Sequence, residues 1–166
     1  GEGGMGLHGV LVANQRGILL LSHYFSSPEQ GWGSQGSEAR VAWEQKLWAL
    51  ASPWPDSAQG AAPNVGVGFL DGVVVVWRTV GDFVIFASGE GEYDELVLEE
   101  QVLPVVEGLL SEHTDSRLSE ANLLHTDNYG KMVTSLDEMQ RSGHLFHTSV
   151  DDILRMSKLR KPEGRS

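Results

Sequence analysis

The stretch NVGVGFLDGVVVVWRTVGDFVIFAS (Asn64–Ser88) predicts three successive antiparallel strands. Asp71-Gly72 is a strong signal for a tight two-residue hairpin turn. A second turn is expected at Val80-Gly81-Asp82. The run Val73–Trp77 is continuously apolar, which is typical of a central strand that is covered on both faces. The stretch therefore predicts a sheet buried between two layers.

A further hairpin is predicted near the start of the chain, in HGVLVANQRGILLLSHYF (His8–Phe25). An apolar run at Val10–Val12 is followed by the turn residues Asn14–Gly17, of which Gly17 can adopt a positive φ. The second run, Ile18–Phe25, then returns antiparallel to the first. These two strands bring the expected sheet to five.

Helices are expected between and after these strands. Ser37 is the predicted N-cap of a helix that ends near Leu50. A long helix is predicted from the apolar spacing over residues 95–113, and Pro104 inside it indicates either a kink or a helix restart. Shorter helices are expected near residues 117–124, 128–140 and 150–159. The predicted fold class is α+β, a five-stranded, mainly antiparallel sheet between helices in the order β-β-α-β-β-β-α-α, forming one domain over residues 7–160 with a flexible basic tail at 161–166.

The first helix is apolar on more than one face. On a helical wheel Trp43, Leu47 and Leu50 share one face, whereas Val41 and Trp48 lie on another. One interpretation is that the helix simply packs on the sheet, with both tryptophans in the core. The other is that the tryptophan facing away from the sheet anchors a partner chain, which gives the candidate interface residues Val41, Trp43, Leu47 and Trp48.

Composition limits the possible functions. The formal net charge of −11 argues against a nucleic-acid partner, which would require a basic face. The absence of cysteine excludes thiolate catalysis and cysteine-rich zinc sites. No apolar run approaches the ~20 residues of a membrane span. The C-terminal end is basic, and Lys158, Arg160 and Lys161 are candidates for contact with an anionic membrane, the alternative being a solvated helix end.

No motif indicates catalysis or cofactor binding. Gly66-x-Gly68 does not open a helix, as a dinucleotide fingerprint must. Asp137 and Glu138 are adjacent, so on a helix their side chains point about 100° apart and do not converge. His144 and His147 follow Gly143, a helix stop, and do not form a predicted metal site. We therefore expect no catalytic residues, no metal, no cofactor and no small-molecule substrate.

Three segments together resemble a known family. In SLDEMQRSGHLFHTS (Ser135–Ser149), an Asp-Glu pair and an apolar residue precede Gly, an apolar strand and Thr-Ser, a pattern similar to the signature of the small chains of coated-vesicle adaptors and coatomer. The matching residues are Asp137, Glu138, Met139, Gly143, Leu145, Thr148 and Ser149. LVANQRGILLLSHYF resembles the opening hairpin of the sigma and zeta chains, and the segment Val74–Glu112 resembles their third to fifth strands and long helix. The resemblance spans residues 8–160.

The resemblance implies a longin-type fold and a non-catalytic role. Such a small chain is held in the curve of a large helical-solenoid subunit of a hetero-oligomeric coat, in the cytoplasm and peripheral to vesicle, Golgi, endosomal or plasma membranes. It also implies that Ser135–Ser149 is scaffold: Asp137 and Glu138 close a helix over the sheet, and Gly143 turns the chain before Thr148 and Ser149.

Some features depart from the family pattern. The loop at Ala51–Pro63 is longer and rich in proline, and Ser119 and Glu120 stand near where apolar residues are expected. Binding of cargo sorting signals is therefore not inferred. The departures are compatible with a divergent coat complex, such as one of the TSET type. The alternative function is that of a longin-domain regulator in a tethering, SNARE or nucleotide-exchange assembly.

Overall fold

A computed structural model describes residues 6–25, 36–51, 65–114, 119–142, 150 and 153–155. The elements run in the predicted order, which confirms the α+β, longin-like fold. In chain order they are β1 (Gly6–Asn14), β2 (Leu19–Tyr24), α2 (Gly36–Leu50), β3 (Val65–Leu70), β4 (Val73–Val80), β5 (Phe83–Glu90), α3 (Glu95–Val97), the π-helical turn η4 (Leu98–Val102), α4 (Leu103–His113), α5 (Glu120–Leu123) and α6 (Thr126–Ser142).

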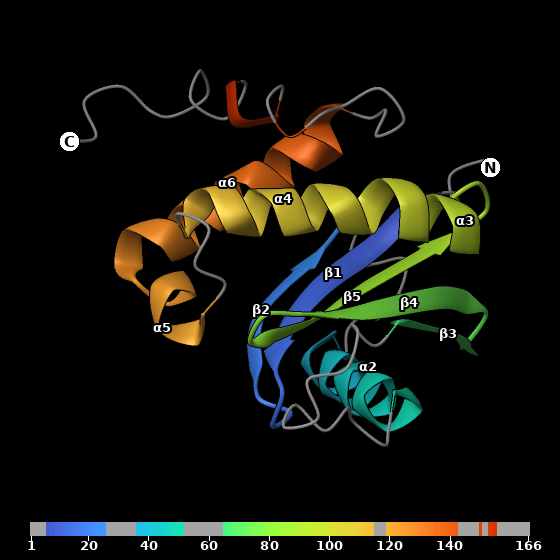
Figure 1. Ribbon diagram of the computed structural model, residues 1–166. Coiled ribbons are helices and arrows are strands. Elements are labelled where there is room, and N and C mark those ends of the chain that lie inside the picture. The colour runs from blue at the N-terminus through green and yellow to red at the C-terminus, as the bar shows by residue number, and fades with distance from the viewer. Residues whose placement is uncertain are drawn as a thin grey trace.

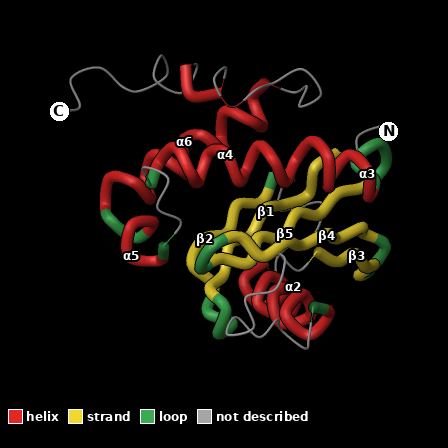
Figure 2. The backbone as a smooth tube through the Cα atoms, viewed as in Figure 1, coloured by secondary structure: helices red, strands yellow, loops and turns green. Residues whose placement is uncertain are grey.

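The five strands form one sheet in the order β2-β1-β5-β4-β3, and every neighbouring pair is antiparallel. The sheet is visible in Figure 2 as the yellow strands between two groups of helices. The predicted turns are confirmed by their backbone angles. Gly17 has φ 95°, and Asp71 and Gly72 have φ 52° and 82°. Positive φ at both central residues is what a type I′ hairpin requires, and Asp-Gly supplies it at low cost.

Helices cover both faces of the sheet (Figure 1). Helix α2 lies on one face, where Trp43 and Leu47 pack with Leu11, Trp77 and Phe86 from the strands. The segment α3–η4–α4 and helix α6 lie on the other face, where their apolar residues form a larger core. Strand residues alternate between the two cores because successive side chains point to opposite faces. The prediction that Val73–Trp77 is covered on both faces is confirmed.

Pro104 lies where a new helical segment begins, as the restart alternative predicts. Residues 98–102 form a π-helical turn, and the N–H of Leu103 donates to the carbonyl of Leu98. Helix α4 then begins at Leu103, with Pro104 in its first turn. Proline is tolerated there because the first N–H groups of a helix have no intrahelical acceptor. The long predicted helix is therefore three joined segments.

Two other helix predictions need comment. Ser37, the predicted N-cap, is wrong in that role because α2 already includes Gly36. The last predicted helix is described only at Val150 and at residues 153–155, which are helical. The expected glycine stop at Gly143, the strand after it and the tail at 161–166 lie outside the described residues. In the described part of the chain, no helix combines the length and the apolar character needed to cross a bilayer.

Two glycines provide a matched test of the packing. A Cβ on Gly66 would stand 2.2 Å from Cζ2 of Trp77, whereas a Cβ on Gly130, which is exposed on helix α6, would have no heavy atom within 4 Å. We expect Gly66→Ala to lower the unfolding free energy by about 1–3 kcal/mol through overpacking. Gly130→Ala should raise it by about 0.5–1 kcal/mol through helix propensity. Urea denaturation measures both, and shifts in the same direction would contradict the packing of Trp77 on β3.

Candidate partner-binding surfaces

Helix α2 divides its apolar residues between two faces as the spacing predicts. Trp43 and Leu47 are buried, with 5% and 2% exposure, against the strands of their own chain. Val41 is 52% exposed, and Trp48 is half-buried. The predicted interface set is therefore corrected in one respect: Trp43 and Leu47 belong to the core. Val41 remains exposed, and Trp48 packs against the edge of this core with part of its ring at the surface.

Trp48 lies over the β1–β2 turn. A Cβ on Gly17 would stand 2.6 Å from Cζ2 of the Trp48 indole. Gly17 is therefore required twice, for its positive φ and for the close approach of this ring. The sequence predicted the turn but not its contact with the helix. This contact restricts the orientation of the Trp48 ring, whose exposed edge lies at the surface.

A groove of about 590 Å³ lies between α2 and the strands β1 and β2. Its walls are formed by Val41 and Trp48 of α2 and by Leu19 of edge strand β2. Its floor is apolar and includes Leu11, Ala13 and Phe86. We call it the α2–β2 groove. Leu19, which lines the groove, is 38% exposed, and its neighbour Ile18 is 51% exposed. The sequence pattern predicted both only as residues of a strand.

Polar contacts beside the groove hold α2 in place. The hydroxyl of Tyr24, at the end of β2, donates to Oε2 of Glu44 over 2.7 Å. Burial, and then the hydrogen bond and charge of Glu44, raise the pKa of Tyr24. The guanidinium carbon of Arg40 lies 5.6 Å from the centre of the Tyr24 ring. The groove is thus bounded by a helix anchored to the edge strand, and a preorganised surface loses less entropy on binding.

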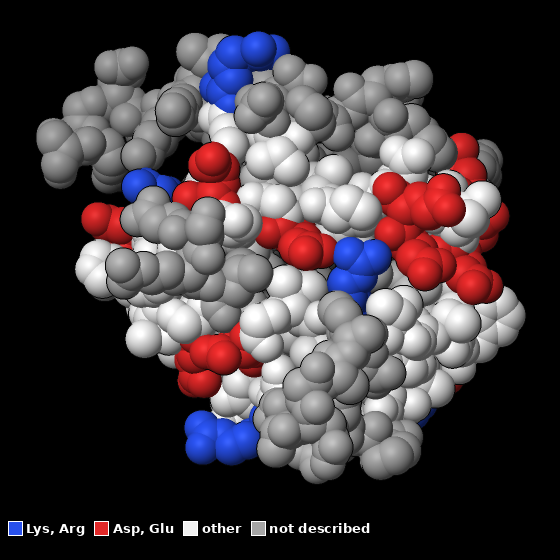
Figure 3. All heavy atoms as spheres, in the orientation of Figure 1, with Lys and Arg blue, Asp and Glu red and all other residues white. Residues whose placement is uncertain are grey.

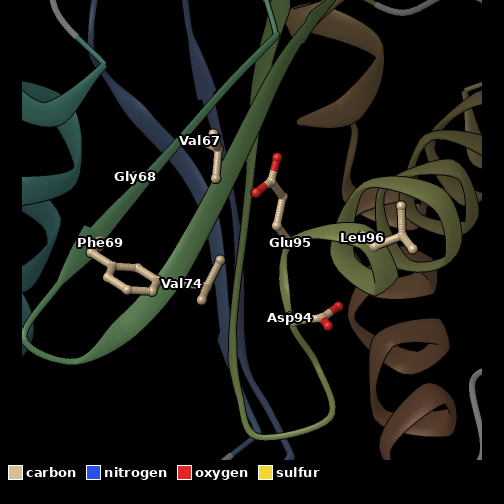
Figure 4. A pocket seen from close by; sticks show the side chains of 7 residues that line it. All are labelled: Val67, Gly68, Phe69, Val74, Asp94, Glu95 and Leu96. Carbon is tan, nitrogen blue, oxygen red and sulfur yellow. The ribbon is translucent and has the colours of Figure 1, made fainter.

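A second apolar surface lies between β3 and α3. Figure 4 shows Val67 and Phe69 of β3 and Val74 of β4 on one side of a groove of about 600 Å³, with Leu96 of α3 on the other. Glu95 stands between the strands and the helix. The carboxylate of Asp94 caps α3 by accepting from the N–H of Val97. We call this the β3–α3 groove; no sequence motif pointed to it.

The signature residues that the structure describes connect helix α6 to the rest of the fold. Leu136 and Met139 lie in the main core, and Glu138 is buried. Exposed Asp137 places Oδ1 3.4 Å from Nε2 of His23 on β2. These positions agree with a scaffold role for the segment. Gly143, Thr148 and Ser149, and the membrane candidates Lys158, Arg160 and Lys161, lie outside the described residues.

Three half-buried histidines should make the fold sensitive to acid. Burial lowers the pKa values of His8, His23 and His113 below 6.5, although Asp137 partly opposes this at His23. As the pH falls through 6.5, such groups bind protons less readily in the folded chain than in the unfolded chain. Stability is therefore complete above pH 6.5 and decreases below it.

We expect the urea midpoint to fall between pH 7.5 and pH 5.5. His113, whose Nε2 lies 2.8 Å from Oγ of Ser135, offers the variant. His113→Gln should reduce the slope of stability against pH, because one titrating group is removed. A midpoint that is constant or rises on acidification would contradict neutral buried histidines.

The chemical character of both grooves is mainly apolar. Within the described ranges, no group of three His, Asp or Glu residues is placed to hold a metal ion. Both grooves are lined mainly by aliphatic and aromatic side chains. Such surfaces are typical of protein–protein contacts, in which a few aromatic anchors are surrounded by polar residues.

Comparison with known proteins identifies a distant relative. No family model matches the chain. The chain is 25% identical over 155 residues to TSET complex member tstD of Dictyostelium discoideum, an alignment that covers 93% of each protein. Since the alignment spans nearly the whole length of both, the homology includes the sheet and the helices on both of its faces. The resemblance to a coat-type small chain is confirmed at this level.

Proposed function

Because the chain is distantly homologous to a TSET complex member, we propose that it is a small, non-catalytic subunit of a vesicle coat or adaptor-like complex. The observation that carries the proposal is the near full-length alignment to tstD. The longin-like order of elements supports it, since the likeness to adaptor small chains implies a longin-type fold. Residues 7–160 form the adaptor-like domain in this proposal, and its task is assembly.

The partner that we propose is a large helical-solenoid subunit bound at the α2–β2 groove. Val41, Ile18 and Leu19 expose apolar surface around this groove. Large apolar patches on soluble proteins usually mark interaction sites. Trp48 supplies a half-buried aromatic ring, the residue type most enriched among interface hot spots. A helix of the partner laid against α2 would cover all four residues.

Assembly tests the function. The full chain, tagged and expressed at its natural level in its own cells, should purify as a hetero-oligomer with a larger chain of helical repeats, identified by mass spectrometry. Native mass measurement should give a defined stoichiometry. Purification as a monomer, or with SNARE or nucleotide-exchange proteins alone, would contradict the coat assignment.

We further propose that the complex acts in the cytoplasm, peripheral to vesicle, Golgi, endosomal or plasma membranes. Lys158, Arg160 and Lys161 make the C-terminal end basic, whereas the chain as a whole carries a net charge of −11. A basic residue near an anionic bilayer contributes about 1 kcal/mol. Replacing the three by glutamine should reduce co-sedimentation of the assembled complex with phosphatidylserine vesicles by tenfold or more. Equal co-sedimentation of both proteins, or equal binding to neutral vesicles, would exclude this contact.

A further inference from the structure

Edge strand β3 exposes Val65, Val67 and Phe69, whereas its two glycines are half-buried. A Cβ on Gly66 would meet the ring of Trp77, and one on Gly68 would stand 2.9 Å from Leu50 of α2. The glycine side of β3 is therefore closed by these two residues. Alternation then directs Val65, Val67 and Phe69 to the opposite face. Phe69 is 70% exposed, and Val65 and Val67 are 45% and 47% exposed.

The helical layer on this face stops short of β3. In Figure 1, α3 and α4 cross the other strands, whereas β3 lies at the far edge of the sheet. The β3–α3 groove occupies the remaining space, with Phe69 and Val67 on one wall and Leu96, 60% exposed, on the other. Four exposed apolar side chains, including Val65, thus line or flank one channel beside an existing helix.

The surroundings of the groove are acidic. Glu95 stands in the groove, and Figure 3 shows acidic side chains gathered over α3. In the sequence, no Lys or Arg occurs between Arg78 and Arg117, while acidic residues are frequent. The guanidinium of Arg78 is already paired, with Nη1 2.8 Å from Oε1 of Glu107. A binding partner would therefore gain from positive charge beside its apolar residues.

We propose that the β3–α3 groove docks an amphipathic helix of a partner protein that carries Lys or Arg along one flank. A helix is about 10 Å across, which matches two strands about 4.8 Å apart and the space beside α3. Two helical turns span about 11 Å, close to the ~13 Å between Val65 and Phe69 along β3. The docked helix would complete the helical layer over the sheet.

Two other occupants fit less well. An extended peptide paired to the edge of β3 would lie in the plane of the sheet and leave Phe69 and Val67 uncovered, because their side chains stand perpendicular to it. A second copy of this chain would bring its own acidic patch against Glu95 and its neighbours. The inference is also independent of the large-subunit contact, since the α2–β2 groove lies on the other face and at the other edge.

Designed peptides test the proposal with the purified full chain. The probe is a labelled 18-residue helix with leucines at i, i+3, i+4 and i+7 and lysines beside them. One comparison peptide carries glutamates in place of the lysines, and another has the same composition with a central proline that breaks the helix. Fluorescence anisotropy should show the lysine helix binding at least tenfold more tightly than either comparison peptide.

Variants locate the binding site. Phe69→Ser should weaken binding of the lysine helix at least tenfold, and Glu95→Gln should weaken it severalfold and reduce its salt dependence. Leu124→Ser is the control, because Leu124 is 47% exposed at the end of α5 and lines neither groove; it should change nothing. Absence of binding, equal binding of the proline peptide, or equal sensitivity to Leu124→Ser and Phe69→Ser would overturn the proposal. Self-association of the chain that disappears in Phe69→Ser would overturn it too, by identifying a second copy as the occupant.

Discussion

Replacing Trp43 by alanine should lower the free energy of unfolding by about 3–5 kcal/mol, the range observed when large aromatic side chains are removed from cores. Trp43 is 5% exposed and packs with Leu11 and Phe86 under the sheet. Its ring also meets that of His8 edge to face, with centroids 5.0 Å apart. Since domains are stable by only about 5–15 kcal/mol, this loss would be a large fraction of the total stability. Urea denaturation of the isolated chain measures it.

Trp48→Ala is the matched control on the same helix. Trp48 is half-buried and contacts the β1–β2 turn at its surface, so its removal should cost much less stability than that of Trp43. Equal losses in the two variants would contradict the assignment of one tryptophan to the core and the other to the surface. A larger loss of stability for Trp48→Ala would mean that Trp48, rather than Trp43, faces the core.

The second large effect is expected for Val41→Glu in the assembled complex. Val41 is 52% exposed, so a charged side chain there should leave the urea midpoint of the isolated chain nearly unchanged. In the proposed interface the new carboxylate would be buried beside Glu44 without a cation, which costs about 2–5 kcal/mol or more. We therefore expect the dissociation constant for the co-purified large subunit to rise about 30-fold or more. Calorimetric titration gives this constant directly.

Leu124→Glu controls for the effect of a new surface charge. Leu124 is 47% exposed at the end of α5, outside the residues that line the α2–β2 groove. Its substitution should leave both the midpoint and the dissociation constant unchanged. Equal weakening by Val41→Glu and Leu124→Glu would show that added negative charge, rather than the groove, determines the affinity.

Local signals predicted the elements of this fold well. Asp71-Gly72 and Gly17 identify their turns because these residue types tolerate the positive φ that the turns require. The continuous apolar run Val73–Trp77 correctly indicated a strand covered on both sides. The helical wheel separated Val41 and Trp48 from Trp43 and Leu47, because the period of a helix is fixed. In each case the information lies within a few neighbouring residues.

Features that depend on contacts between distant segments were not predicted. The wheel could not say which face of α2 meets the sheet, since both faces carry a tryptophan. Strand β3 alternates valine and glycine, a pattern that suggests valine packs inward, yet Trp77 and Leu50 occupy the glycine side and leave Phe69 outside. The β3–α3 groove exists because the valine side of β3, rather than the glycine side, is exposed. No short stretch of sequence indicates this. The π-helical turn before Pro104 was likewise visible only in the backbone.

Photo-crosslinking tests the central claim most directly, that a large helical subunit holds this chain by the outer face of α2. Benzoylphenylalanine is placed at position 41 in the assembled complex, and separately at position 124 on α5. We expect position 41 to form a covalent adduct with the large subunit. Mass spectrometry should map this adduct to a helix of the solenoid. Position 124 should form no such adduct. A complex that assembles fully but forms no adduct with the large subunit from position 41, or forms it equally from position 124, would contradict the account.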